Sequence, residues 1–134
     1  MITPILRVRD VDRSLAFYTR ALGFEGQGGL PGEDGQTVVA EATLGDARII
    51  ISRRCDRLTG ASELYITLPD EIDLERFYET LKKRAVCILD ELHDELWGDR
   101  AFTVVDLDAN RLIFAQMKRY AALIPERTAL AESA

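Results

Sequence analysis

The sequence is poor in the residues that mark secreted, thiol-based or membrane-spanning proteins. Its only two cysteines, Cys55 and Cys87, stand far apart, which fits neither a disulfide framework nor a C-x-x-C metal site. No uninterrupted apolar run approaches the roughly 20 residues needed to cross a bilayer. The N-terminus runs directly into patterned sequence without the features of a secretory signal. We therefore expect no membrane association and a cytoplasmic location.

Basic residues are also fewer than acidic residues. The chain has 17 Lys and Arg against 23 Asp and Glu, a formal net charge of -6 and a pI of about 4.8. This charge repels a phosphate backbone, and the small group Arg53, Arg54 and Arg57 has no interleaved aromatic residues, so nucleic acid is not an expected partner. A cationic ligand would be attracted, although an acidic balance is also ordinary for soluble proteins.

The first half of the chain predicts one strand, one helix and three further strands. Alternating apolar residues predict a strand at the N-terminus, and Asp10 or Asp12 then caps a helix that ends at Gly23. A short strand at 24–27 and a glycine-rich loop at 28–35 follow. Two strands at 37–44 and 47–53, joined at Gly45-Asp46, complete the unit.

The second half repeats this order. A strand at 63–68, a helix capped by Asp73 and strands at 86–89, 102–105 and 112–116 are predicted. Matching residues recur at nearly constant spacing: Asp70, Phe77 and Tyr78 follow Asp10, Phe17 and Tyr18 by 60 positions, and Arg111 follows Arg48 by 63. Core packing alone would explain a recurring Phe-Tyr pair, whereas the combination favours a tandem duplication.

These patterns predict an α+β fold in one domain at 1–117, followed by a C-terminal tail at 118–134. The domain consists of two tandem βαβββ modules, at about 1–56 and 61–117. Each module combines an amphipathic helix with a sheet that has one apolar face. We expect the two sheets to join edge to edge into one cup-shaped, curved mixed sheet with the helices outside. Its concave side is the natural ligand site.

Two segments resemble a known superfamily. The first is LRVRDVDRSLAFY at 6–18 with LGF at 22–24, and the second is WGDRAF at 97–102, which leads to DLDANRL at 106–112. Together they are similar to motifs of the vicinal oxygen chelate superfamily of glyoxalase I, bleomycin-resistance proteins and extradiol dioxygenases. The bleomycin-resistance branch looks closest. The resemblance covers about Thr3 to Gln116 and implies a homodimer built from cup-shaped half-barrels.

The resemblance also locates four slots in which metal-binding members carry His, Gln or Glu, on the first and last strands of each module. Here these slots hold Thr3, Ile50, Glu63 and Ile113. Metal-binding relatives read Asp-Pro-Asp-Gly-Asn and then Glu at the second motif, where this chain has Leu107, Ala109 and Ile113. One carboxylate beside two isoleucines cannot supply about three oxygen or nitrogen ligands, so neither a metal nor another cofactor is expected.

His93 is the only histidine and lies in an acidic stretch, Glu91 to Glu95. A lone histidine there is most simply a solvated residue, although it is also a candidate general base. No nucleophile motif accompanies it, so the sequence predicts no catalytic triad.

With apolar residues in the metal slots, the cup becomes a groove for an aromatic ligand. The predicted lining residues, each of which also fits ordinary packing, are Thr3, Ile5, Ile50, Glu63, Tyr65, Trp97, Arg100, Phe102 and Ile113. Trp97 is the only tryptophan, and the resemblance places it beside the drug groove, where its ring would stack on planar groups. The acidic residues around it, from Asp90 to Asp99, would attract a cation at the rim or are simply solvated.

Three functions remain open on the sequence alone. The first is metal-independent sequestration of a bulky aromatic natural product, which would confer antibiotic resistance. The second is an enzyme of the same fold, a lyase, isomerase or oxygenase, in which Glu63 is the base and Tyr65 or Arg100 polarises the substrate. The third is a regulatory or structural module without a small ligand.

Overall fold

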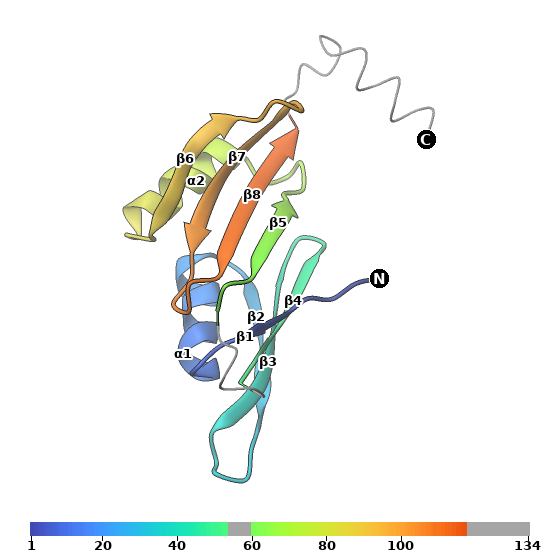
Figure 1. Cartoon of the computed structure of the whole chain (residues 1–134), viewed down its shortest axis with the longest axis vertical. Helices are drawn as coiled ribbons and strands as arrows, with labels where there is room; N and C mark the ends of the chain where they lie inside the picture. The colour runs from blue at the N-terminus through green and yellow to red at the C-terminus, as the bar shows by residue number, and fades with distance from the viewer. Residues whose placement is uncertain (54–59, 118–134) are drawn as a thin grey trace.

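In the computed structural model, residues 1–53 and 60–117 are described, and each half of the chain forms a four-stranded mixed sheet (Figure 1). The first module consists of β1 (Ile5–Arg7), α1 (Val11–Ala16), a π-helical turn η1 (Phe17–Ala21), β2 (Glu25–Pro31), β3 (Thr37–Leu44) and β4 (Ala47–Ser52). Its strand order is β1-β4-β3-β2, with β1 parallel to β4 and the other pairs antiparallel. Arg54, Cys55, Arg57 and the tail at 118–134 lie outside the described residues.

The second module repeats this arrangement. It consists of β5 (Glu63–Thr67), α2 (Leu74–Lys83), β6 (Ile88–Asp94), β7 (Asp99–Val105) and β8 (Arg111–Met117). Its strand order, β5-β8-β7-β6, is that of the first module, and β5 is again parallel to β8. The predicted α+β class and the two similar modules are confirmed. In the part of the chain that is described, no helix is long and apolar enough to span a membrane.

Local sequence explains where both helices begin. The Asp10 carboxylate accepts a hydrogen bond from the Arg13 amide at 3.0 Å, and the Asp73 carboxylate accepts one from the Arg76 amide at 3.1 Å. Each aspartate thereby caps amide groups that have no partner within the helix. Gly23 follows the first helix with φ +84°, a left-handed conformation that glycine adopts without strain.

Three predictions about the strands are corrected. The predicted loop at 28–35 is strand as far as Pro31, because β2 is an edge strand whose register shifts tolerate its glycines. The strand predicted at 86–89 begins at Ile88 and continues to Asp94, since His93 pairs with Ala101 of β7 despite its charged neighbours. Charged residues are common on an edge strand, where they discourage pairing with other chains.

The third correction concerns the join between the modules. The sheets were expected to meet edge to edge in one curved sheet, but the recorded strand pairs between described residues stay within each module. One reason is that β1 is only three residues long. Pro4, directly before it, accepts a hydrogen bond from the Ile50 amide of β4 at 3.0 Å but has no amide hydrogen to offer to a further strand.

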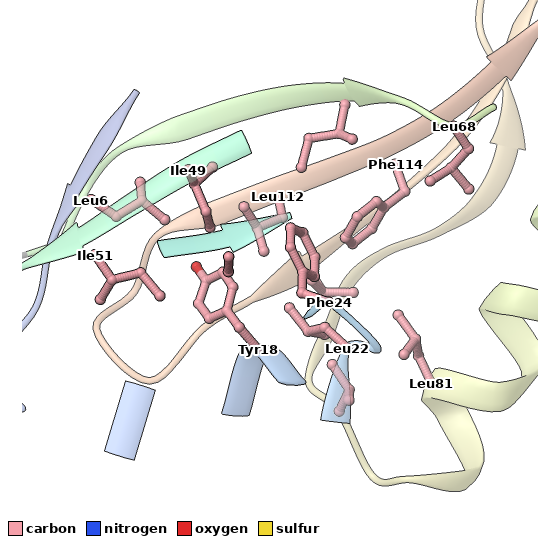
Figure 2. Packing of buried hydrophobic residues seen from close by; sticks show 14 of the residues in the cluster. Leu6, Tyr18, Leu22, Phe24, Ile49, Ile51, Leu68, Leu81, Leu112 and Phe114 are labelled. Carbon is pink, nitrogen blue, oxygen red and sulfur yellow. The ribbon is translucent and has the colours of Figure 1, made fainter. Parts of the chain in front are cut away.

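The helix-covered faces of both sheets share one core. Leu6, Ile49 and Ile51 from the first sheet and Leu112 and Phe114 from the second lie in the same buried cluster (Figure 2). Phe24, just after η1, reaches Phe114 of β8, with 6.4 Å between ring centroids. The shared core supports a single domain at 1–117, which stays a prediction. Within 1–53 and 60–117, no helix lies on the opposite face of either sheet (Figure 1).

A buried polar contact also links the modules. The Asp106 carboxylate, in the β7–β8 loop, accepts hydrogen bonds from the Tyr18 hydroxyl at 2.7 Å and from Asn110 Nδ2 at 2.9 Å. Burial, together with the Asp106 carboxylate, raises the pKa of Tyr18, so this hydroxyl remains a donor. Nearby, Arg9 Nε lies 3.0 Å from a carboxylate oxygen of Asp108. The loop thus holds the first module against the second.

Candidate functional site

The free face of the second sheet presents an aromatic surface. Strand register places Tyr65 of β5 opposite Ile113 of β8, and Ile113 opposite Thr103 of β7. Because side chains alternate along a strand, these residues point away from the face that Phe102 and Phe114 present to the helix. Tyr65 is 45% exposed and Trp97, in the turn before β7, is 50% exposed.

Tyr65 and Trp97 meet at a buried carboxylate. The Tyr65 hydroxyl donates to Asp99 Oδ2 at 2.6 Å, and Trp97 Nε1 lies 3.2 Å from both that oxygen and the Tyr65 hydroxyl. The two rings are 6.5 Å apart between centroids and tilted by 51°. Asp99 itself is only 8% exposed. Burial, followed by the hydrogen bond to Asp99, raises the pKa of Tyr65, so the phenol keeps its proton at neutral pH.

The Tyr65 side chain crosses the sheet diagonally. Its neighbour in register on β7 is Thr103, yet its hydroxyl reaches Asp99, four residues earlier on that strand. Ala101 and Ala115 occupy the face between these points, and neither has exposed surface. Small residues here let the aromatic ring lie close to the sheet.

A hollow of about 300 Å³ lies beside this aromatic surface, at the seam between the modules. It is lined by Ile2, Pro4 and the start of β4 on one side and by residues 64–67 of β5 on the other. Tyr65 therefore borders both the hollow and the Trp97 contact. The lining combines apolar residues of both modules with the charged residues Asp46 and Arg48.

The free face of the first sheet is apolar at β1 and charged beyond it. Ile5 lies opposite Ile50, and Ile50 lies opposite Glu41 of β3. Arg48 pairs with Glu41 at 2.8 Å, and the hydrogen bond from Arg48 lowers the pKa of that carboxyl. Ile5 and Ile50 thus occupy the places in the first module that Tyr65 and Ile113 occupy in the second.

The predicted lining residues divide between two faces. Ile5, Ile50, Tyr65, Trp97 and Ile113 lie on or beside the free faces, as described above. Glu63 is exposed at the start of β5, opposite Arg111, and Thr3 precedes β1.

Arg100 and Phe102 lie on the helix side instead. Arg100 contacts Glu75 of α2, and the Phe102 ring lies 4.9 Å from that of Tyr78 and has no exposed surface. The sequence-based assignment of these two residues to the groove is corrected, because β7 alternation turns them toward α2.

Asp99 is the functional candidate that sequence reasoning placed only among rim charges. The available signal was its spacing: it stands two and four residues before Ala101 and Thr103, so a strand extended back to position 99 puts it on their face. The burial of the Asp99 side chain could not be deduced, because it depends on a contact with Tyr65, which lies 34 residues away in the sequence.

The residues in the slots that correspond to the superfamily's metal ligands do not fit a metal ion. Ile50 and Ile113 carry no donor atom, and Glu63 is the only one of the four with a carboxylate. No three His, Cys, Asp or Glu side chains gather into a ligand set within 1–53 and 60–117. A catalytic metal site needs about three protein ligands of oxygen or nitrogen type, which these four residues do not supply.

His93 is occupied by two acceptors. Its Nδ1 lies 2.7 Å from the Glu91 carbonyl oxygen and its Nε2 lies 2.8 Å from the Glu95 carboxylate. These contacts, the carbonyl first, raise the pKa of His93. Only the imidazolium can donate from both nitrogens, which leaves His93 poorly suited to act as a base in this conformation.

Comparison with known proteins places the fold. TioX from Micromonospora sp. ML1 is similar with a TM-score of 0.71 and 19% identity over 88% of this chain and 96% of TioX. TnmS3, an antibiotic binding protein from Streptomyces sp. CB03234, is similar with a TM-score of 0.71 and 20% identity over 88% of this chain and 96% of TnmS3. A glyoxalase/bleomycin resistance protein/dioxygenase from Alicyclobacillus acidocaldarius is similar with a TM-score of 0.67 and 19% identity over 87% of this chain and 91% of that protein.

At these identities the structures establish the fold alone. Among curated proteins, none matches this sequence. The sequence profile of the Glyoxalase/Bleomycin resistance protein/Dioxygenase superfamily matches residues 2–114, nearly the whole of both modules. The match agrees with the two βαβββ units and their common strand order. The chain therefore belongs to the glyoxalase/bleomycin resistance protein/dioxygenase superfamily.

Proposed function

We propose that this protein binds and sequesters a bulky, planar aromatic natural product without a metal ion, and that it thereby confers antibiotic resistance. One observation carries the proposal: two half-exposed aromatic rings, Tyr65 and Trp97, are fixed by Asp99 on a sheet face that no helix among the described residues covers. Stacking on such rings contributes about 0.5–1.5 kcal/mol per pair beyond the area buried. TnmS3, whose fold is similar, is described as an antibiotic binding protein, which supports the same class of ligand.

We further propose that the groove is completed in a cytoplasmic homodimer. Ile5, Tyr65, Trp97 and Met117 each expose between 45% and 53% of their surface. Ile5, Tyr65 and Met117 lie on the free faces, with Trp97 beside them, so a second copy would give a ligand apolar walls on two sides. Sedimentation equilibrium should return twice the chain mass of 15.0 kDa, and a monomer at all concentrations would contradict this part of the proposal.

A fluorescence titration tests the binding function. Trp97 is the only tryptophan, so its emission reports directly on this face. Chelator-treated protein titrated with bleomycin-type and planar aromatic antibiotics should show saturable quenching with a Kd at or below about 1 μM, or roughly -8 kcal/mol. Trp97→Phe, followed by calorimetry, should bind the same compound more weakly. Binding that appears only after a divalent metal is added would contradict the proposal.

A further inference from the structure

The hydrogen bonds that Tyr65 and Trp97 donate to Asp99 determine which parts of these two side chains a ligand can contact. Tyr65 and Trp97 each direct their single polar atom to Asp99 Oδ2. What these half-exposed side chains then offer to a ligand is ring surface rather than hydrogen-bond donors. A carboxylate lies directly behind both rings.

The surroundings of these rings are negative. Glu95 acts on Tyr65 electrostatically together with Asp99, and Glu63 is exposed two residues before Tyr65 on the same strand face. Arg100, next to Asp99 in sequence, points to the opposite face, where it contacts Glu75 and Asp94. His93 Nε2 lies 2.8 Å from a carboxylate oxygen of Glu95. With a chain charge of -6 besides, this face favours a positive ligand.

Aromatic ring faces and carboxylates attract the same class of molecule. A ring face carries negative quadrupole potential that attracts cations, and a carboxylate shielded from water attracts a nearby positive charge more strongly than a solvated carboxylate does. A flat, delocalised cation can use both interactions at once. We propose that the ligand of this site is a planar aromatic cation whose rings stack on Trp97 and Tyr65 and whose positive charge is stabilised by the buried Asp99 carboxylate behind these rings and by the exposed Glu63 carboxylate on the same face. This inference rests on the proposed binding function.

Three acridines of nearly equal shape separate this inference from the function on which it rests. At neutral pH 9-aminoacridine is a cation, acridine is neutral and acridine-9-carboxylate is an anion. Calorimetry should find the cation bound at least about tenfold more tightly than neutral acridine, with the anion weakest. Neutral acridine bound as tightly as the cation would overturn the inference while leaving aromatic binding intact. No binding of any of the three would count against both.

Variants locate the recognition at Asp99. Asp99→Asn, which keeps the shape of the side chain but removes its charge, should weaken the binding of 9-aminoacridine about tenfold and the binding of acridine less than about threefold. Asp94→Asn makes the same change in net charge on the helix side and should leave both affinities within about threefold. Glu63→Gln, at an exposed position on the binding face, should weaken only the binding of the cation, by about two- to threefold. This check does not depend on the fold of the Asp99 variant. Equal losses in the Asp94 and Asp99 variants would contradict a specific site.

Discussion

The two modules are alike where they face the helices and different where they do not. At matching positions, Leu6 and Ile66 are both buried on the helix side, as are Ile51 and Phe114. On the free faces, Ile5 of the first module corresponds to Tyr65 of the second. Core packing restrains the helix-facing side of the repeat, whereas the free faces differ, and only that of the second module carries the aromatic and acidic groups of the candidate site.

The modules also differ in the turn before the last strand. The first uses the two-residue turn Gly45-Asp46, with Gly45 at φ +57°. The second uses a five-residue loop, 106–110, in which Asp106 binds backbone and side-chain donors as well as Tyr18 of the first module. The longer loop thus stabilises the contact between modules. Three pairs of variants test this difference, in order of decreasing effect.

The largest effect is expected from Asp106→Ala. It leaves the Tyr18 hydroxyl and Asn110 Nδ2 buried without their acceptor, and each such group costs about 1–3 kcal/mol, so we expect a loss of about 3–5 kcal/mol in the free energy of unfolding. Asp46→Ala, at the exposed turn of the first module, should change it by less than about 0.5 kcal/mol. Urea denaturation measures both. Equal effects would show that the loop has no special role.

A smaller effect is expected from the duplicated tyrosines. Tyr18→Phe removes a hydrogen bond to a buried carboxylate and should cost about 1.5–3 kcal/mol. Tyr78 is also buried, but within the described residues no hydrogen bond of its hydroxyl is recorded. Tyr78→Phe keeps the ring that packs on Phe102 and should stay within about 0.5 kcal/mol. Urea midpoints that fall equally for both would contradict the asymmetry between the modules.

The smallest expected effect is an increase in stability, for a variant of Ala109. Ala109 has φ +65°, a left-handed conformation that costs a residue with a Cβ about 1–2 kcal/mol. Ala109→Gly removes this strain but increases the entropy of the unfolded chain, so a net stabilisation of about 0.5–1 kcal/mol is expected. Gly45→Ala in the first module should destabilise, because its φ is positive and its new Cβ would lie 2.9 Å from Pro69. Thermal melting of both variants checks the signs, and a destabilised Ala109→Gly would refute the strain.

Much of this fold could be predicted from local sequence. Helix starts at Asp10 and Asp73, the stop at Gly23 and the turn at Gly45-Asp46 depend on residues a few positions apart. The extent of β2 and β6 could not be predicted, because glycines and charges there are tolerated only through pairing with a distant strand. The separation of the two sheets likewise depends on the core that the modules share.

The candidate site was predictable in part, for a similar reason. Residue type and position predict Tyr65 and Trp97 as lining residues, and both are about half exposed, while their role in binding stays a prediction. Phe102 and Arg100 were assigned to the wrong face, because their orientation follows from the strand register of β7 against β8. The role of Asp99 arises from a contact between residues 34 positions apart, which no local pattern contains.

The most direct test of the central claim is to map a bound aromatic ligand on the protein by NMR. With saturating 9-aminoacridine, the largest shift changes in a ¹H–¹⁵N spectrum should fall on the Trp97 indole N–H and on the amides of Tyr65, Thr103 and Ile113, which share the free face of the second sheet. Changes concentrated instead on the polar hollow beside α1, at Asp10, Arg13 and Thr37, would contradict the account.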